Sequence, residues 1–91
     1  QLTWLRSLPA RRVVAADALQ AEALALARRL AAGPTLAYGR MKRLLRASFD
    51  NDLATQLDAE RAAFVAGTRT HDFAEGLAAF FERRPAAFEG R

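Results

Sequence analysis

The sequence predicts an all-α fold of about four amphipathic helices arranged in helical hairpins. Two observations lead to this prediction. Leucine, alanine and phenylalanine recur every three or four residues along most of the chain, which is the period of a helix with one apolar face. Residues that cap or break helices stand between these runs. The one β-branched pair, Val13-Val14, indicates at most the end of a strand.

The first predicted helix covers residues 17–32. Asp17 is its expected N-cap, and Gly33-Pro34 is expected to supply a left-handed glycine stop followed by a breaker. The second helix covers residues 34–48, with Pro34 in its first turn. Its apolar side chains are expected to face the core: Leu36, Met41, Leu44, Leu45 and Phe49.

The third predicted helix covers residues 52–66 and follows a cap offered by Asp50-Asn51. One apolar stripe runs along it: Leu53, Leu57 and Phe64. Glu60 lies on the same stripe. An acid on an apolar face needs a partner, so we expect an ion pair with Lys42 or Arg43 of the second helix.

The fourth predicted helix covers residues 71–84, with Thr70-His71-Asp72 at its start and Arg83-Arg84-Pro85 at its end. Its apolar side is lined by Phe73, Leu77, Phe80 and Phe81. Residues 1–12 are irregular in pattern and are expected to form a lead-in to a helical domain over 13–91. Because so short a chain buries little, we expect something outside it to cover part of its apolar surface.

Length and composition exclude several classes of protein. With 91 residues, 52% of them hydrophobic, the chain is one small folded domain rather than a disordered one. Without cysteine it has no disulfide, thiolate metal site or cysteine nucleophile. Uncharged apolar runs such as Ala23 to Ala27 are far shorter than the ~20 residues of a membrane span, and no signal peptide is evident. A cytoplasmic location is expected.

No catalytic constellation stands out from the residues. His71 is the only histidine, so it cannot form a metal site alone, and we expect it to face solvent near a helix start. Ser7 and Ser48 lack the strained, exposed setting of a nucleophile. Asp50 and Asp52 are typical of capping residues. No catalytic residue and no metal ligand is therefore assigned.

Basic residues outnumber acidic ones by 14 to 10, which gives a net charge of +4. The densest positive cluster lies on the second helix: Arg40, Lys42, Arg43 and Arg46. The signs are mixed along the chain and no DNA- or RNA-binding motif is present, which argues against nucleic acid as a partner. A free-standing helical protein-interaction or nucleic-acid-binding module stays open as the alternative function.

The order of residues resembles a known family. The features are Leu30-Ala-Ala-Gly-Pro-Thr35, then Lys42, Leu57 and Glu60, and finally the closing run D-F-x-E-G-x-x-A-F-x-E-R-R-x-x-x-F-x-G-R from Asp72 to Arg91. From about Val13 onward the chain is similar to the C-terminal helical region of the crotonase superfamily, the enoyl-CoA hydratases and isomerases. The entry to the second helix resembles the phenylacetate-pathway isomerase and hydratase branch.

The resemblance implies a division of labour within a larger enzyme. In this family a spiral α/β core carries the oxyanion hole and catalytic carboxylates, while C-terminal helices cap the active site and pack subunits into trimers. The core has no counterpart in these residues. We therefore expect the C-terminal capping and oligomerisation region of an enoyl-CoA hydratase or isomerase, inactive alone and self-associating into homo-oligomers.

One ligand role is implied by the resemblance. In several members an aromatic residue near the end of the third helix and a basic residue in the closing E-[KR]-R run contact the adenine and phosphate end of coenzyme A. These positions match Phe64 and Arg83. Acyl-CoA is thus the expected small-molecule partner of the parent enzyme, with coenzyme A as part of the substrate and no separate cofactor.

Overall fold

The computed structural model describes residues 12–91, and every helix in that range lies where the sequence predicts one. A short 3₁₀ turn, η2, precedes four α-helices; their bounds are η2 Ala16–Ala18, α1 Leu19–Ala31, α2 Thr35–Ala47, α3 Leu53–Gly67 and α4 His71–Glu82. Residues 12–91 contain no strand, so Val13-Val14 is extended without pairing. The expected lead-in, residues 1–12, lies almost entirely outside the described range.

The helix ends correct four local predictions. Asp17 does not cap α1, because it lies inside the 3₁₀ turn and the N-cap position is Ala18, which has no side-chain cap. Gly33 follows α1 without the expected left-handed conformation, since Gly90 is the one glycine of positive φ in residues 12–91. Pro34 stands at the N-cap position of α2 instead of in its first turn. Asp52 caps α3, and not Asp50-Asn51, because its carboxylate accepts the Thr55 N–H at 2.8 Å.

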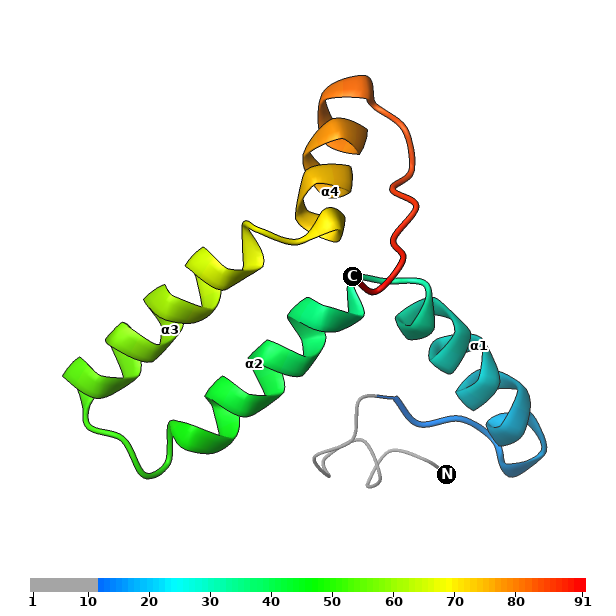
Figure 1. Ribbon diagram of the computed structural model, residues 1–91. Helices are drawn as coiled ribbons and strands as arrows, with labels where there is room; N and C mark the ends of the chain where they lie inside the picture. Colours follow the sequence, from blue (N-terminus) through cyan, green and yellow to red (C-terminus); the bar gives the residue numbers. More distant parts are fainter. Residues whose placement is uncertain (1–11) are drawn as a thin grey trace.

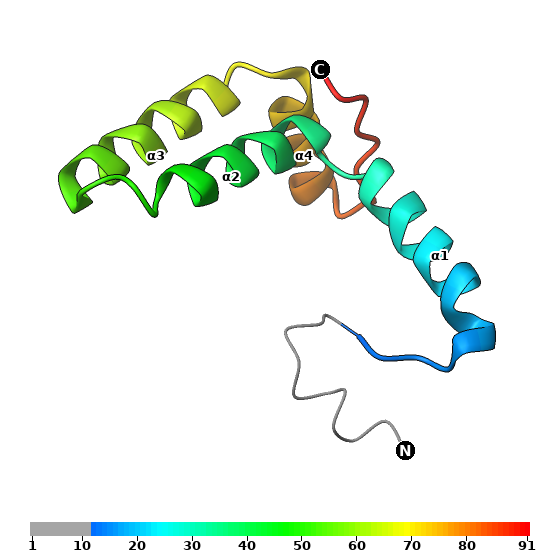
Figure 2. The same cartoon turned by 90° about the horizontal axis from the view of Figure 1, so that it is seen from below.

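α2 and α3 form an antiparallel hairpin and lie side by side in both Figure 1 and Figure 2. Gln56 of α3 ties the pair together because its side-chain amide donates to the Leu44 carbonyl of α2 at 3.2 Å. The Asn51 side chain in the connecting turn donates in turn to Gln56 Oε1 at 3.1 Å. Half-buried Ala59 and Ala63 complete the contact face of α3.

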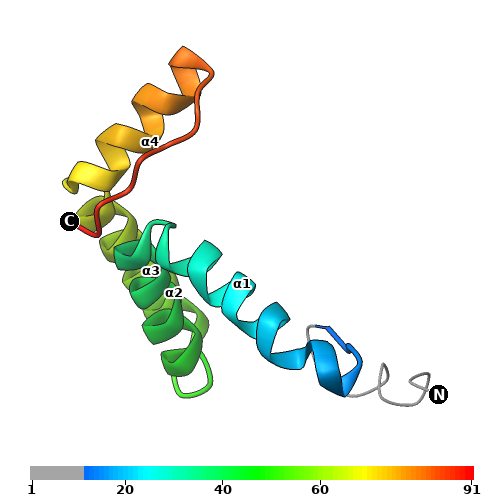
Figure 3. The ribbon, with the colours of Figure 1, turned by 90° about the vertical axis from the view of Figure 1, so that its right-hand side faces the viewer.

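The hairpin stands apart from the other helices. Figure 3 shows α1 leading away from one side of it and α4 from the other. The Cα radius of gyration is 17.2 Å, whereas a compact domain of this length has one of about 12 Å. The fold is therefore open, and each helix exposes most of its surface.

The expected core does not form within residues 12–91. Ala79 is the only buried apolar residue in that range, at 3% exposure. Of the second-helix residues expected to face a core, Leu44 alone is half-buried, and Phe49, which lies just beyond the end of α2, is 90% exposed. The helical stripes are present, but within residues 12–91 they meet other helices only in small contacts, such as the α2–α3 contact and the Phe64–Phe73 ring pair.

We expect Thr70→Ala to destabilise the chain by about 1 kcal/mol, because Thr70 is the N-cap of α4. Its hydroxyl accepts the Phe73 N–H at 3.1 Å and donates to the Gly67 carbonyl at 2.8 Å, so it joins the end of α3 to the start of α4. Urea unfolding followed by far-UV circular dichroism measures the loss. Thr68→Ala is the matched control, since the Thr68 hydroxyl bonds only within α3, to the Val65 carbonyl; an equal loss there would contradict the capping role.

Candidate functional site

An apolar groove of about 500 Å³ lies between α2, α3 and α4. Its walls include Met41 and Leu44 from α2, Phe64 from α3, Phe73 and Leu77 from α4, and Phe88 from the segment after α4. Phe64 and Phe73 meet edge to face, with ring centroids 6.4 Å apart. Phe64, Met41 and Leu77 are at least 46% exposed, so the groove is open to solvent.

A few polar side chains border this groove. Arg40 of α2 lies beside Gly67, the last residue of α3, where its charge faces the negative end of the α3 dipole. Glu60 reaches the groove from α3 and accepts a hydrogen bond from Gln56 at 3.3 Å. The expected ion pair of Glu60 with Lys42 or Arg43 is not among the ion pairs of residues 12–91. Gln56, one turn away on α3, donates a hydrogen bond to the Glu60 carboxylate instead.

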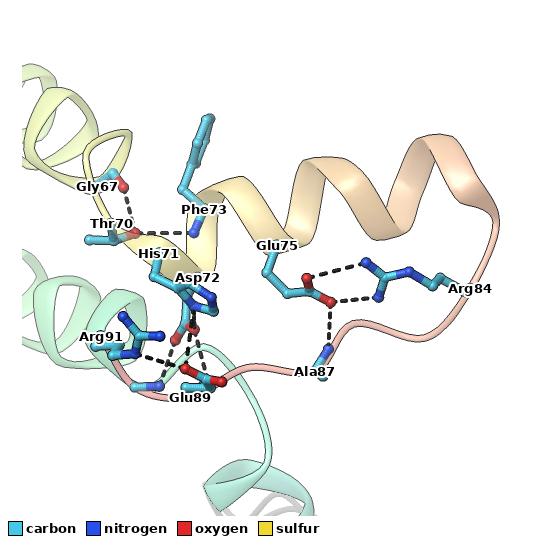
Figure 4. Close-up of polar contacts among 11 residues, drawn as sticks. Gly67, Thr70, His71, Asp72, Phe73, Glu75, Arg84, Ala87, Glu89 and Arg91 are labelled. Atoms are coloured by element: carbon cyan, nitrogen blue, oxygen red, sulfur yellow. Dashed lines mark hydrogen bonds and ion pairs between the residues drawn. The ribbon is translucent and has the colours of Figure 1, made fainter.

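The segment after α4, residues 85–91, folds back along the helix, and we call it the strap (Figure 1). Asp72, buried at 4% exposure, holds its far end (Figure 4). Asp72 Oδ1 accepts the Glu89 N–H at 2.8 Å and Oδ2 accepts the Gly90 N–H at 2.9 Å. The Asp72 N–H donates to the Arg91 carbonyl at 2.9 Å. The backbone of the strap is thus fixed to the first turn of α4.

Glu75, one turn further along α4, holds the near end of the strap. Its carboxylate accepts a hydrogen bond from each terminal N–H group of Arg84, at 2.6 and 3.2 Å, in a bidentate ion pair. The same carboxylate accepts the Ala87 N–H at 2.9 Å (Figure 4). Arg84 also pairs with Glu82 at 2.5 Å. A chain of charge-assisted bonds therefore runs from α4 through its C-terminal turn to the strap.

These contacts favour the ionised carboxylates. The Glu89 N–H is the main cause that lowers the pKa of Asp72, with smaller contributions from Gly90 and His71. The Arg84 guanidinium is the main cause that lowers the pKa of Glu75 from 4.5 to about 2, and the Ala87 N–H adds to it. Both groups thus bind the strap in their charged form.

The two sequence-predicted ligand positions are not brought together within one copy. Phe64 lies in the groove against Phe73, at the first turn of α4. Arg83 follows the last turn of the same helix, about 15 Å further along its axis. Arg83 adopts the left-handed conformation, with φ 55° and ψ 45°, and takes part in none of the side-chain hydrogen bonds or ion pairs of residues 12–91.

His71 is near the α4 start as predicted, with its side chain 38% exposed and its Nδ1 3.5 Å from Asp72 Oδ1. Within residues 12–91, no three histidine or acidic side chains gather as metal ligands would. No helix in the described part of the chain is long and apolar enough to cross a bilayer. Ser7 lies outside the described range, and the Ser48 hydroxyl donates to the Leu45 carbonyl.

Reasoning from single residues did not identify Asp72 and Glu75 as strap-holding groups. Both stand in the closing run that carries the family resemblance, but their roles depend on backbone amides 12 to 18 residues later in the chain. One feature of the sequence is consistent with this role of Asp72 and Glu75. Two acids spaced i and i+3 share a helix face, and the residues after that helix include a proline and a glycine that favour a return of the chain.

Comparison with known proteins identifies one family. Residues 10–91 match the family described as enoyl-CoA hydratase/isomerase. The chain is 38% identical over 79 residues to 1,2-epoxyphenylacetyl-CoA isomerase of Escherichia coli K12, covering 87% of this chain and 30% of that protein. It is 39% identical over 67 residues to a protein of Rhodobacter capsulatus named probable enoyl-CoA hydratase, covering 74% of this chain and 26% of the relative.

Solved structures give the same result. The crystal structure of enoyl-CoA hydratase subunit I from Geobacillus kaustophilus superposes with a TM-score of 0.82 at 36% identity. The match covers 88% of this chain and 31% of that one. The chain therefore spans under a third of the length of these relatives, and its open helical arrangement corresponds to part of a larger fold.

Proposed function

Since the chain belongs to the enoyl-CoA hydratase/isomerase family, we propose that it is the C-terminal capping and oligomerisation region of an acyl-CoA enzyme, inactive without a catalytic core. The observation that carries this proposal is the apolar surface of α3 and α4. Phe64, Phe80 and Phe81 are each at least 67% exposed. Such a surface is typical of a helix layer that another protein surface covers.

Self-association through this surface is energetically reasonable. Burial of apolar area contributes about 25 cal/mol per Å², so each phenylalanine that becomes covered contributes about 1.5–3 kcal/mol. Phe80 and Phe81 are adjacent and already stack edge to face, with centroids 5.5 Å apart, so they present one aromatic surface. We propose that copies of the chain meet there, as subunits would in the parent enzyme.

Light scattering and sedimentation test this proposal. The unaltered chain is expected to be a homo-oligomer, and the double variant Phe80→Ser/Phe81→Ser is expected to shift to the monomer. The matched control is Leu19→Ser/Leu24→Ser on α1, which removes two exposed apolar side chains elsewhere. A well-ordered monomer for the unaltered chain, or an equal shift in the control, would overturn the oligomerisation role.

Contact with coenzyme A is the second part of the proposal. Phe64 offers an exposed aromatic face for the adenine, and Arg83 offers a guanidinium with no recorded partner in residues 12–91 for the phosphates. Phe64 of α3 lies beside the first turn of α4, whereas Arg83 follows its last turn. We therefore propose that one bound coenzyme A contacts Phe64 of one copy through its adenine and Arg83 of another copy through its phosphates. Calorimetry with coenzyme A is expected to show weaker binding for Phe64→Ala. Salt-dependent binding to DNA in place of coenzyme A would favour the nucleic-acid alternative.

A further inference from the structure

The strap is attached to α4 through its main chain. Three of its amides, those of Ala87, Glu89 and Gly90, donate to carboxylate oxygens of Glu75 and Asp72 (Figure 4). A hydrogen bond to a charged acceptor contributes more than a neutral one. Apart from the bond of the Asp72 N–H to the Arg91 carbonyl, the hydrogen-bonded attachment of these amides therefore depends on the charge of two side chains and on no side chain of the three donating residues.

The attached strap positions Phe88. This residue lies between the held amides of Ala87 and Glu89, and its ring packs on Gly76, where an added Cβ would lie 3.6 Å from the ring. The ring forms part of the groove wall. At Gly90 the strap reaches the start of α2, since a Cβ there would lie 3.1 Å from the Thr35 hydroxyl. The strap thus closes the groove on the side between α4 and α2.

The charged groups around the two carboxylates come from three helices, the turn after α4 and the strap. His71 on α4 lies 3.5 Å from Asp72 and 3.9 Å from Glu89, and Glu89 pairs with Arg91 at 2.7 Å within the strap. Arg40 on α2 and Glu60 on α3 border the same groove as Asp72. Glu75 faces Arg84, which is shared with Glu82. Arg84 therefore bonds directly to Glu75, and strap amides bond directly to both acids.

We infer that the strap is an acid-released latch: protonation of Asp72 and Glu75 frees residues 85–91 from α4 and withdraws Phe88 from the groove. Protonation turns one oxygen of Asp72 into a donor, so the two amide bonds to its two oxygens cannot both persist unchanged. Protonation of Glu75 removes the charge that strengthens its bonds to Arg84 and to the Ala87 N–H. Both carboxyl groups have a lowered pKa in the folded chain. The attachment is therefore complete above their ordinary values and is lost as the pH falls toward the lowered ones.

An NMR titration of the full chain tests the latch. The probes are the amide signals of the strap and the cross-peak between the Phe88 ring and the Gly76 backbone. As the pH falls from 4.5, the ordinary pKa of Glu75, to about 2, its pKa in the folded chain, the strap signals are expected to move together and the cross-peak to weaken, with most of the change near the lower end of that range. Amide signals of the α2–α3 hairpin are expected to persist over that range.

Two variants and one control sharpen the result. Asp72→Asn retains one acceptor oxygen and is expected to weaken the Phe88–Gly76 cross-peak at neutral pH. Glu75→Gln keeps an acceptor for the Ala87 N–H but no charge, so the Ala87 signal should lose its acid response. Asp58→Asn, at a carboxylate 79% exposed, is the control. A cross-peak that acid does not weaken, a hairpin lost at the same pH as the strap, or an equal effect of Asp58→Asn would overturn the latch.

Discussion

Replacing Ala79 by leucine is expected to destabilise the chain by about 2 kcal/mol, because it overfills the most tightly packed face of α4. Asp72, Gly76 and Ala79 follow the helical spacing of i, i+4 and i+7, so they share one face. The strap covers that face: Asp72 binds its backbone and Gly76 touches Phe88. Ala79 is 3% exposed and has no room for three more carbon atoms.

Thermal unfolding by circular dichroism measures this loss, which corresponds to a fall in melting temperature of about 10 °C for a domain of this size. Ala74→Leu is the matched control, since Ala74 is exposed on the same helix. The control is expected to change stability by less than about 0.5 kcal/mol. Equal losses at both positions would mean that the face between α4 and the strap is not closely packed.

Replacing Arg83 by glycine is expected to raise stability and lower the affinity for coenzyme A. Arg83 ends α4 in the left-handed conformation, which costs a residue with a Cβ about 1–2 kcal/mol and costs glycine almost nothing. The greater freedom of glycine in the unfolded chain offsets part of this gain, so we expect a net stabilisation of about 0.5–1 kcal/mol. Loss of the guanidinium is expected to weaken coenzyme A binding on the order of tenfold or more, the usual effect of losing a charged hydrogen bond.

Unfolding and calorimetry on the same samples separate the two effects. Arg83→Lys keeps the charge, so it is expected to retain most of the affinity without any gain in stability. Arg83→Gly with unchanged affinity would exclude Arg83 from the proposed coenzyme A contact. Arg83→Gly with lowered stability would mean that the side chain supports the fold. A variant that gains stability and loses affinity is typical of a position where the natural residue serves ligand binding at a cost in stability.

The helices could be predicted from the sequence because their signals are local. The apolar period, the Thr70 cap and the stop at Gly33 all act within a few residues, and the structure places each helix within about three residues of its predicted bounds. The helix ends that were predicted wrongly also depend on local signals. Two successive candidates for a cap stood before α3, Asp50-Asn51 and Asp52, and the pattern alone did not distinguish them.

Burial and the strap could not be predicted in the same way. A stripe such as the one that contains Leu45 and Phe49 shows which side of a helix is apolar, but not whether anything lies against it. The 3D structure shows what covers each residue, and it leaves Leu45 and Phe49 at least 67% exposed. The positions of Phe64 and Arg83 came from a family resemblance, whereas the role of Asp72 required backbone geometry far along the chain.

The local character of the contacts also sets an order for folding. The α2–α3 hairpin joins neighbouring helices, so the entropic cost of closing its short turn is small and the hairpin can form early. The strap contacts of Asp72 reach residues 17 and 18 positions later in the chain. During synthesis α4 therefore emerges with Asp72 hydrated, and the groove gains its last wall only when Gly90 arrives beside Thr35.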